Sequence, residues 1–160
     1  MATLVTSGRT AIAASVRARP IFMGWGSGNA AWDTVLIPED VSKSALLNPV
    51  GYRKLTESSY CVPDAQGGIV VPTGRFSVTQ TPTNNLYLRF TFDFEDSSAA
   101  QIRETGIFLD TVVAAGLPAG QMYFSPAQVT NPGTMLLAEN IARINRTPAT
   151  RESFEFVVTF

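Results

Sequence analysis

Gly24, Gly26 and Gly28 stand at alternate positions in FMGWGSGNAAWD, residues 22–33, which also contains Trp25 and Trp32, and this spacing could bind a phosphate. A dinucleotide-binding loop needs the pattern G-x-G-x-x-G between a strand and a helix whose N-terminus faces the pyrophosphate. Here Asn29 stands at the third glycine position, and Pro38 interrupts the segment that would form the helix. The alternative is that glycine supplies a positive φ or leaves room for a packed ring. We expect this second, structural role.

Nucleophilic and metal chemistry have few candidate residues. The chain contains no histidine, which excludes Ser-His-Asp and Cys-His triads and every histidine-based zinc site. Cys61 is the one cysteine, so no disulfide forms within the chain, and a lone cysteine is more often a small core residue than a nucleophile. We therefore expect a protein that is not an enzyme and has no cofactor or metal.

Paired carboxylates are the remaining catalytic possibility, because glycosidases need only two acids. The cluster DFEDSS contributes Asp93, Glu95 and Asp96, whose oxygens also suit Ca²⁺. Acids and serines at a strand end more often cap a turn, which is the role we expect. Glu104 is an interior acid or, more commonly, a strand residue that faces solvent or pairs with an arginine. The candidate partners are Arg89, Arg103, Arg143 and Arg146. A hydrolase using Asp93, Glu95 or Glu104 is a distant alternative.

The composition describes a globular protein with few charges. Hydrophobic residues make up 45% of the chain and charged residues 16%, with a net charge of -1. The cations are spread along the chain, so no basic patch marks a nucleic-acid or membrane partner. No apolar run reaches about 18 residues, and the first residues do not form a signal peptide. We expect a soluble protein made in the host cytoplasm, with no small-molecule substrate.

The hydrophobic period separates an N-terminal helical part from a long strand-rich part. Thr6 or Ser7 can begin a helix that continues to about Ala18 and ends before Pro20. Pro38 offers a second helix start, before a stop at Asn48 and Pro49.

From about residue 50 the period is two, which is typical of antiparallel strands. In LYLRFTFDF the predicted inward residues are Leu86, Leu88, Phe90, Phe92 and Phe94. In FEFVVTF they are Phe154, Phe156, Val158 and Phe160. Weaker strands fit 52–62, 69–79, 103–110 and 135–144.

These elements predict a mainly β fold: one domain over residues 1–160, an antiparallel β-sandwich or partial barrel with one or two short helices near the N-terminus. Two long loops remain, at 23–50 and 111–133, and such loops in a compact domain are usually functional. Aromatic residues supply much of the contact area of interfaces. The interface candidates are therefore Trp25, Trp32, Tyr52 and Tyr123, with burial in the core as the alternative for each.

Three segments resemble parts of known phage proteins. TSGRTAIAASVRARPIFMGWGSGNAAWD resembles the opening of bacteriophage tail-fibre and tail-collar attachment domains, and ETGIFLD is similar to a strand of the same group. LLAENIARINRTPATRESFEFVVTF is similar to the closing strands of phage tail and baseplate proteins. The resemblance covers both ends of the chain and leaves the middle unmatched.

The resemblance implies a structural component of a phage or phage-derived tail, located in the virion. Its partners would be other tail or baseplate subunits and copies of itself. Fibre proteins of this kind continue into long shafts, whereas this chain stops at Phe160, which favours a small connector or adaptor. The alternative is a carbohydrate-binding or receptor-binding module on β-sandwich loops, and glycan binding would separate the two.

Overall fold

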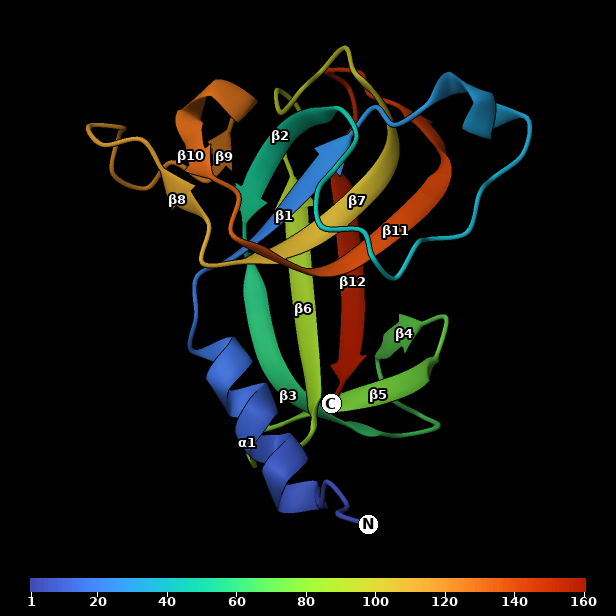
Figure 1. The fold of residues 1–160 in the computed structure, drawn as a ribbon, viewed down its shortest axis with the longest axis vertical. Helices are drawn as coiled ribbons and strands as arrows, with labels where there is room; N and C mark the ends of the chain where they lie inside the picture. The colour runs from blue at the N-terminus through green and yellow to red at the C-terminus, as the bar shows by residue number, and fades with distance from the viewer. The chain divides into compact units, whose positions relative to one another are not determined.

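The computed structural model describes all residues from 1 to 160, and the chain divides into two compact units (Figure 1). The first unit comprises Met1–Arg19, Leu55–Phe90 and Ser153–Phe160. The second comprises Pro20–Lys54 and Thr91–Glu152. Because the chain passes between them several times, neither unit is one continuous segment, and the single domain expected from the sequence stays a prediction.

A five-stranded antiparallel sheet, in the order β11-β7-β1-β2-β9, forms the second unit. Its middle strand, β1 (Ile21–Gly26), is buried at every residue and lies between β7 (Gln101–Leu109) and β2 (Pro49–Lys54). The outer strands are β11 (Thr134–Asn145), beside β7, and the short β9 (Tyr123–Phe124), beside β2. The apolar run after Pro20 thus becomes the covered centre of a sheet.

Short elements complete the second unit. Strand β8 (Val112–Val113) pairs with β10 (Val129–Asn131), and η1 (Ala30–Asp33) and η2 (Pro126–Gln128) are single 3-10 turns. An apolar cluster forms the core here. Its members are Phe22, Leu46, Tyr52, Phe108 and Phe124, and Val113, Leu117, Val129 and Met135 pack against it. The region 111–133, expected as a loop, therefore contains short strands.

The first unit has its own five-stranded sheet, in the order β12-β6-β3-β5-β4. Its strands are β3 (Glu57–Pro63), β4 (Ile69–Val71), β5 (Gly74–Thr79), β6 (Asn85–Phe92) and β12 (Glu152–Thr159). The last residues of β6 and the first of β12 belong to the second unit.

The helix α1 (Thr6–Arg17) belongs to the first unit and buries Ala13 and Val16. At its C-terminal end, the Arg17 guanidinium lies 4.8 Å from the centre of the Tyr60 ring and donates to Ser58 on β3. The predicted N-terminal helix is confirmed. No helix of the chain is long and apolar enough to cross a membrane.

The predicted mainly β, antiparallel fold is confirmed, and each weaker predicted strand overlaps a strand or hairpin. The helix predicted after Pro38 is wrong, because residues 34–48 form no helix or strand. The inward position of Phe94 is also wrong, since β6 ends at Phe92 and Phe94 is exposed. Tyr87, expected on the polar face of β6, is buried because a second apolar cluster packs there. That cluster consists of Cys61, Ile69, Phe76 and Tyr87.

Candidate docking surface

Residues 34–48 of the second unit, which we call the strap, connect η1 to β2 without helix or strand. Five large apolar side chains of the strap have exposed fractions between 49% and 105%. They are Val35, Leu36, Ile37, Val41 and Leu47. A gathering of exposed apolar side chains in one segment is typical of an interaction site, whereas single exposed ones need no explanation.

Glu104 on β7 holds the strap through buried polar contacts. Its side chain is fully buried, and Oε1 accepts the backbone N–H groups of Leu47 at 2.7 Å and Asn48 at 3.2 Å. Oε2 accepts the Lys43 ammonium at 2.7 Å. A buried carboxylate is costly unless it is paired and hydrogen-bonded, and these three donors meet that need. Glu104 is thus an interior acid; the expectation that it faces solvent or pairs with an arginine is wrong, because the strap supplies its donors.

Asn140 on β11 holds the strap at a second place. Its Nδ2 donates to the Ile37 carbonyl at 2.8 Å, and its Oδ1 accepts from the Lys43 ammonium at 3.2 Å. Its backbone N–H donates to Glu39 Oε1 at 2.8 Å. Since β11 is the last strand of its sheet, Glu39 also covers a backbone donor that another strand could otherwise pair with. The strap backbone is therefore fixed while its apolar side chains stay exposed.

The glycines after Phe22 make room for the strap's anchors. A Cβ on Gly24 would lie 2.8 Å from both Leu46 and Tyr52 side-chain atoms, where Leu46 enters the core. A Cβ on Gly26 would collide with the Glu104 carboxylate. Gly28 has φ of 55°, which favours glycine, and the Trp32 ring lies against it. The structural role expected for these glycines is confirmed.

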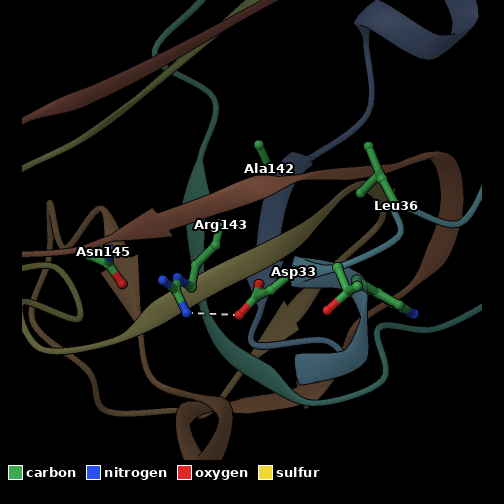
Figure 2. Close-up of a pocket in the computed structure, with 7 residues that line it drawn as sticks. Asp33, Leu36, Ala142, Arg143 and Asn145 are labelled. Carbon is green, nitrogen blue, oxygen red and sulfur yellow. Dashed lines mark hydrogen bonds and ion pairs between the residues drawn. The ribbon is translucent and has the colours of Figure 1, made fainter.

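A pocket of about 410 Å³ lies where the strap begins, beside the end of β11. Its lining residues are Trp32, Asp33, Thr34, Leu36, Ala142, Arg143 and Asn145. Figure 2 shows the Arg143 side chain reaching from β11 to Asp33, which accepts Nη1 of Arg143 at 2.7 Å. Asp33 also accepts Nε and Nη2 of Arg103 at 2.7 and 2.8 Å. These hydrogen bonds hold the pKa of Asp33 below its ordinary value, and those from Arg103 have the largest effect.

The four aromatic interface candidates lie in different surroundings. Trp25 is fully buried and stacks on Phe92 with ring centres 3.6 Å apart, and Tyr52 is a core cluster member. Tyr123 is half-buried, and its hydroxyl contacts Ser97 and donates to the Val50 carbonyl. Trp32 is half-buried in the pocket wall. Trp25 and Tyr52 are thus core residues, which was the alternative given for each candidate. Trp32 lines an open pocket and stays an interface candidate.

Two acids of DFEDSS, Asp93 and Asp96, hold a turn, as expected, and Glu95 is exposed. Asp96 Oδ2 accepts the backbone N–H of Asp93 at 2.7 Å and Nη1 of Arg53 at 2.6 Å. Asp93 pairs with Arg53 and Arg151, and the hydrogen bond from Arg151, followed by those from Arg53, lowers the pKa of Asp93 despite the opposing effect of its burial. Across the chain, no three His, Cys, Asp or Glu side chains gather in a way that could hold a metal ion.

The anchors of the strap and the ion pairs of the pocket could not be predicted from the sequence. Lys43, Glu104 and Asn140 are far apart in the chain, as are Asp33 and Arg143. One signal was present: the apolar run Val35-Leu36-Ile37 stands inside a segment with no strand or helix period, directly before Pro38.

A protein-family model described as "Baseplate wedge 3 tail fiber network component" matches residues 1–160, the whole chain. No curated protein shows significant similarity to the chain. The family match confirms the phage tail and baseplate origin that the terminal segments implied.

Proposed function

We propose, given that this chain belongs to the baseplate wedge 3 tail fiber network family and is a structural protein of a phage tail, that it is a connector whose strap docks onto a neighbouring baseplate subunit. Membership of this family implies contacts with other baseplate or tail components. The surface that makes these contacts is, in this proposal, the strap.

The observation that carries the proposal is the inverted arrangement of the strap. Its polar contacts, to Glu104 and Asn140, point into the unit, while its large apolar side chains are exposed. An ordinary surface loop has the reverse arrangement, because exposed apolar area gains nothing in water. Covering each of these side chains with a partner would contribute roughly 1.5 to 3 kcal/mol before the costs of association.

The fixed backbone of the strap supports the same function. Ordering a loop during binding costs free energy that is subtracted from the affinity. Here Glu104 fixes Leu47 and Asn48, and Asn140 fixes Ile37. The strap backbone is therefore held at Ile37, Leu47 and Asn48 before any partner arrives.

A triple substitution, Val35→Ser, Ile37→Ser and Val41→Ser, tests the proposal. These side chains are exposed, so we expect a folded protein with an unchanged melting temperature that fails to enter assembled tails. The matched control replaces three exposed valines of the first unit, Val62, Val70 and Val78, by Ser. We expect the control to assemble normally. Normal incorporation of the strap variant would contradict the proposal.

The partner of the strap is proposed to be a different subunit, with a second copy of this chain as the alternative. Sedimentation of the purified protein distinguishes them. If the wild type and the strap variant are both monomers at the same concentration, the partner is a different subunit. A dimer that the strap variant abolishes would make the partner a second copy.

A further inference from the structure

We propose that the pocket beside the strap receives a segment of the neighbouring subunit in which a carboxylate stands next to a bulky apolar side chain. This inference rests on the proposed function, since it names the chemistry of the partner that the docking surface meets. We call the site the Arg143 pocket, with the lining given above.

The charges of the Arg143 pocket are unequal. Two charged side chains line the pocket, Asp33 and Arg143. Asp33 is already paired through both oxygens with Arg103, which lies outside the lining, so the cluster of Asp33, Arg103 and Arg143 has two guanidinium groups for one carboxylate. Arg103 is buried and spends further N–H groups on neutral acceptors, the Ser27 carbonyl and the Gln101 amide. The site therefore carries a net positive charge that an incoming carboxylate would neutralise.

The unmatched positive charge is accessible on Arg143. Its side chain is 42% exposed, and its contact with Asp33 uses Nη1. A guanidinium has five N–H donors in a planar fork that suits a carboxylate with two parallel hydrogen bonds. Arg103, by contrast, is enclosed on β7 and already binds Asp33 through two nitrogens. Arg143 is the group that meets the partner.

The remaining walls of the pocket are partly apolar and lie at a break in the sheet. The half-buried Trp32 and the exposed Leu36 form one side. The other side is the part of β11 where the pairing register with β7 breaks between Asn140 and Ile144. A bulky apolar side chain fits against Trp32 and Leu36, and the irregular β11 backbone leaves space for an extended segment.

A sugar fits this chemistry less well than an acid. Carbohydrate sites on β-proteins need carboxylate or amide oxygens free to accept hydroxyl groups. A carboxylate has about four acceptor positions, and Asp33 already accepts three N–H donors from Arg103 and Arg143. Of the two charged side chains that line the pocket, Arg143 is the one with free hydrogen-bonding capacity, and a cation favours an anion. The neutral Thr34 and Asn145 side chains are the groups that a sugar would use, and the sugar probe below tests them.

The test uses small probes and a built-in reporter. The chain has two tryptophans, so an NMR spectrum of N–H groups contains two indole signals: Trp32 in the pocket and the fully buried Trp25 as internal reference. N-acetyl-phenylalanine supplies a carboxylate beside an aromatic ring. Its amide, N-acetyl-phenylalaninamide, supplies the same ring without the charge, and methyl glucoside supplies a neutral sugar. Each is titrated into wild type and into Arg143→Gln.

We expect the acid to shift the Trp32 signal with an affinity about tenfold higher than that of the amide, since a charge-assisted pair contributes about that factor. Arg143→Gln should remove this difference and leave the Trp25 signal and melting temperature unchanged. Equal shifts from acid and amide, or no shift from either, would overturn the inference. A Trp32 shift from methyl glucoside alone would overturn it in favour of a glycan site.

The outcome is separable from the test of the proposed function. Val35, Ile37 and Val41 do not line the Arg143 pocket, so their serine variant should bind the acid as wild type does. If the serine variant fails to assemble and the wild type does not bind the acid, the proposed connector function stands and the inference about the pocket fails. If the wild type binds the acid and the serine variant assembles normally, the inference about the pocket stands and the docking surface does not include the strap.

Discussion

The strap and the segment 111–133 both contact the same apolar cluster of the second unit, and they direct their side chains in opposite ways. Segment 111–133 packs Val113, Leu117 and Val129 against the cluster. The strap sends in Leu46 and leaves five large apolar side chains exposed. One segment covers the core and the other displays apolar surface.

The two segments are also held by different forces. Segment 111–133 is held by strand pairing, of β8 with β10 and of β9 with β2, and by polar contacts within it: the Ser125 N–H donates to Gln128 Oε1 at 3.0 Å and Thr111 donates to the Pro132 carbonyl at 2.8 Å. The strap has no strand pairing and is held by the side chains of Glu104 and Asn140. A segment that turns its apolar side chains outward gives up hydrophobic anchoring, so buried polar groups must hold it. This difference can be tested one substitution at a time.

The largest effect is expected from removing the strap's charged anchor. Glu104→Ala removes the acceptor of two strap N–H groups and the carboxylate paired with the Lys43 ammonium, which keeps only Asn140 Oδ1. Breaking a buried pair in this way costs about 3 to 5 kcal/mol, which urea unfolding measures. The control is Glu57→Ala, since the Glu57–Arg89 pair is well exposed and should cost less than about 1 kcal/mol. Similar losses in both variants would remove the special role of Glu104.

The next effect is expected at the backbone of segment 111–133. Gly133 has φ of 84°, and a Cβ there would collide with the Leu109 carbonyl. Gly116 has φ of 79° and nothing near its Cβ position. We expect Gly133→Ala to lower the free energy of unfolding by about 2 kcal/mol or more and Gly116→Ala by about 1 kcal/mol. If Gly116→Ala cost as much, steric contact would not be what fixes this segment.

A smaller effect distinguishes a side chain that covers the apolar cluster from one that is exposed on the strap. Leu117→Ala removes a side chain packed against the cluster, and we expect a loss of about 1 to 2 kcal/mol. Leu47→Ala removes a side chain that is 55% exposed and keeps the backbone N–H that binds Glu104, so its change should stay within about 0.5 kcal/mol. Unfolding midpoints in urea give both values. A larger loss for Leu47→Ala would show that the strap packs on the unit rather than displaying its side chains.

The smallest effect is a pH dependence where the strap meets β11. Burial, and then the neighbouring Glu39 carboxylate, raise the pKa of Glu139 above its ordinary 4.5. A raised folded-state pKa contributes stability that is fully present below 4.5 and is lost as the pH rises through the folded value. Glu139→Gln should remove this loss, so that its stability relative to wild type increases with pH above 4.5.

Comparing unfolding of wild type and Glu139→Gln at several pH values measures the effect. Asp33 and Asp93 have lowered pKa values, so their contributions are lost only as the pH falls below 3.8 and do not overlap this window. A difference between the two proteins that does not change between pH 4.5 and neutrality would contradict the raised pKa of Glu139.

Local patterns were sufficient to predict most of the fold. The helix before Pro20, the strand at Leu86–Phe92 and the C-terminal strand each follow from the period of a few neighbouring residues. The burial of Tyr87 was not predictable in this way, because it depends on Cys61, Ile69 and Phe76 from other strands. The alternation of apolar and polar residues predicts which face of a strand is buried. Whether the opposite face is also covered depends on the tertiary packing.

The candidate site was predictable only in outline. The sequence predicted that the loop 23–50, which includes the strap, is functional, and that Trp32 is an interface candidate with burial in the core as the alternative. Both stay predictions. The burial of Glu104 was the less favoured of two alternatives, because its donors lie 57 and 61 residues away in the chain at Leu47 and Lys43. The Asp33–Arg143 pair joins residues 110 apart. Such contacts depend on which strands become neighbours, and one sequence carries no direct sign of that.

The hydrogen bonds from Leu47 and Asn48 to Glu104 have a consequence for the rate of assembly. A surface that must order itself after collision associates slowly, whereas a prearranged one associates at about 10⁵ to 10⁷ M⁻¹s⁻¹. The strap backbone is held in advance, so in the proposed docking, changes in its exposed side chains should act on how long a docked subunit remains in place. A tail built from such subunits can reject a wrongly seated copy by rapid dissociation and still fill the correct position at nearly full speed.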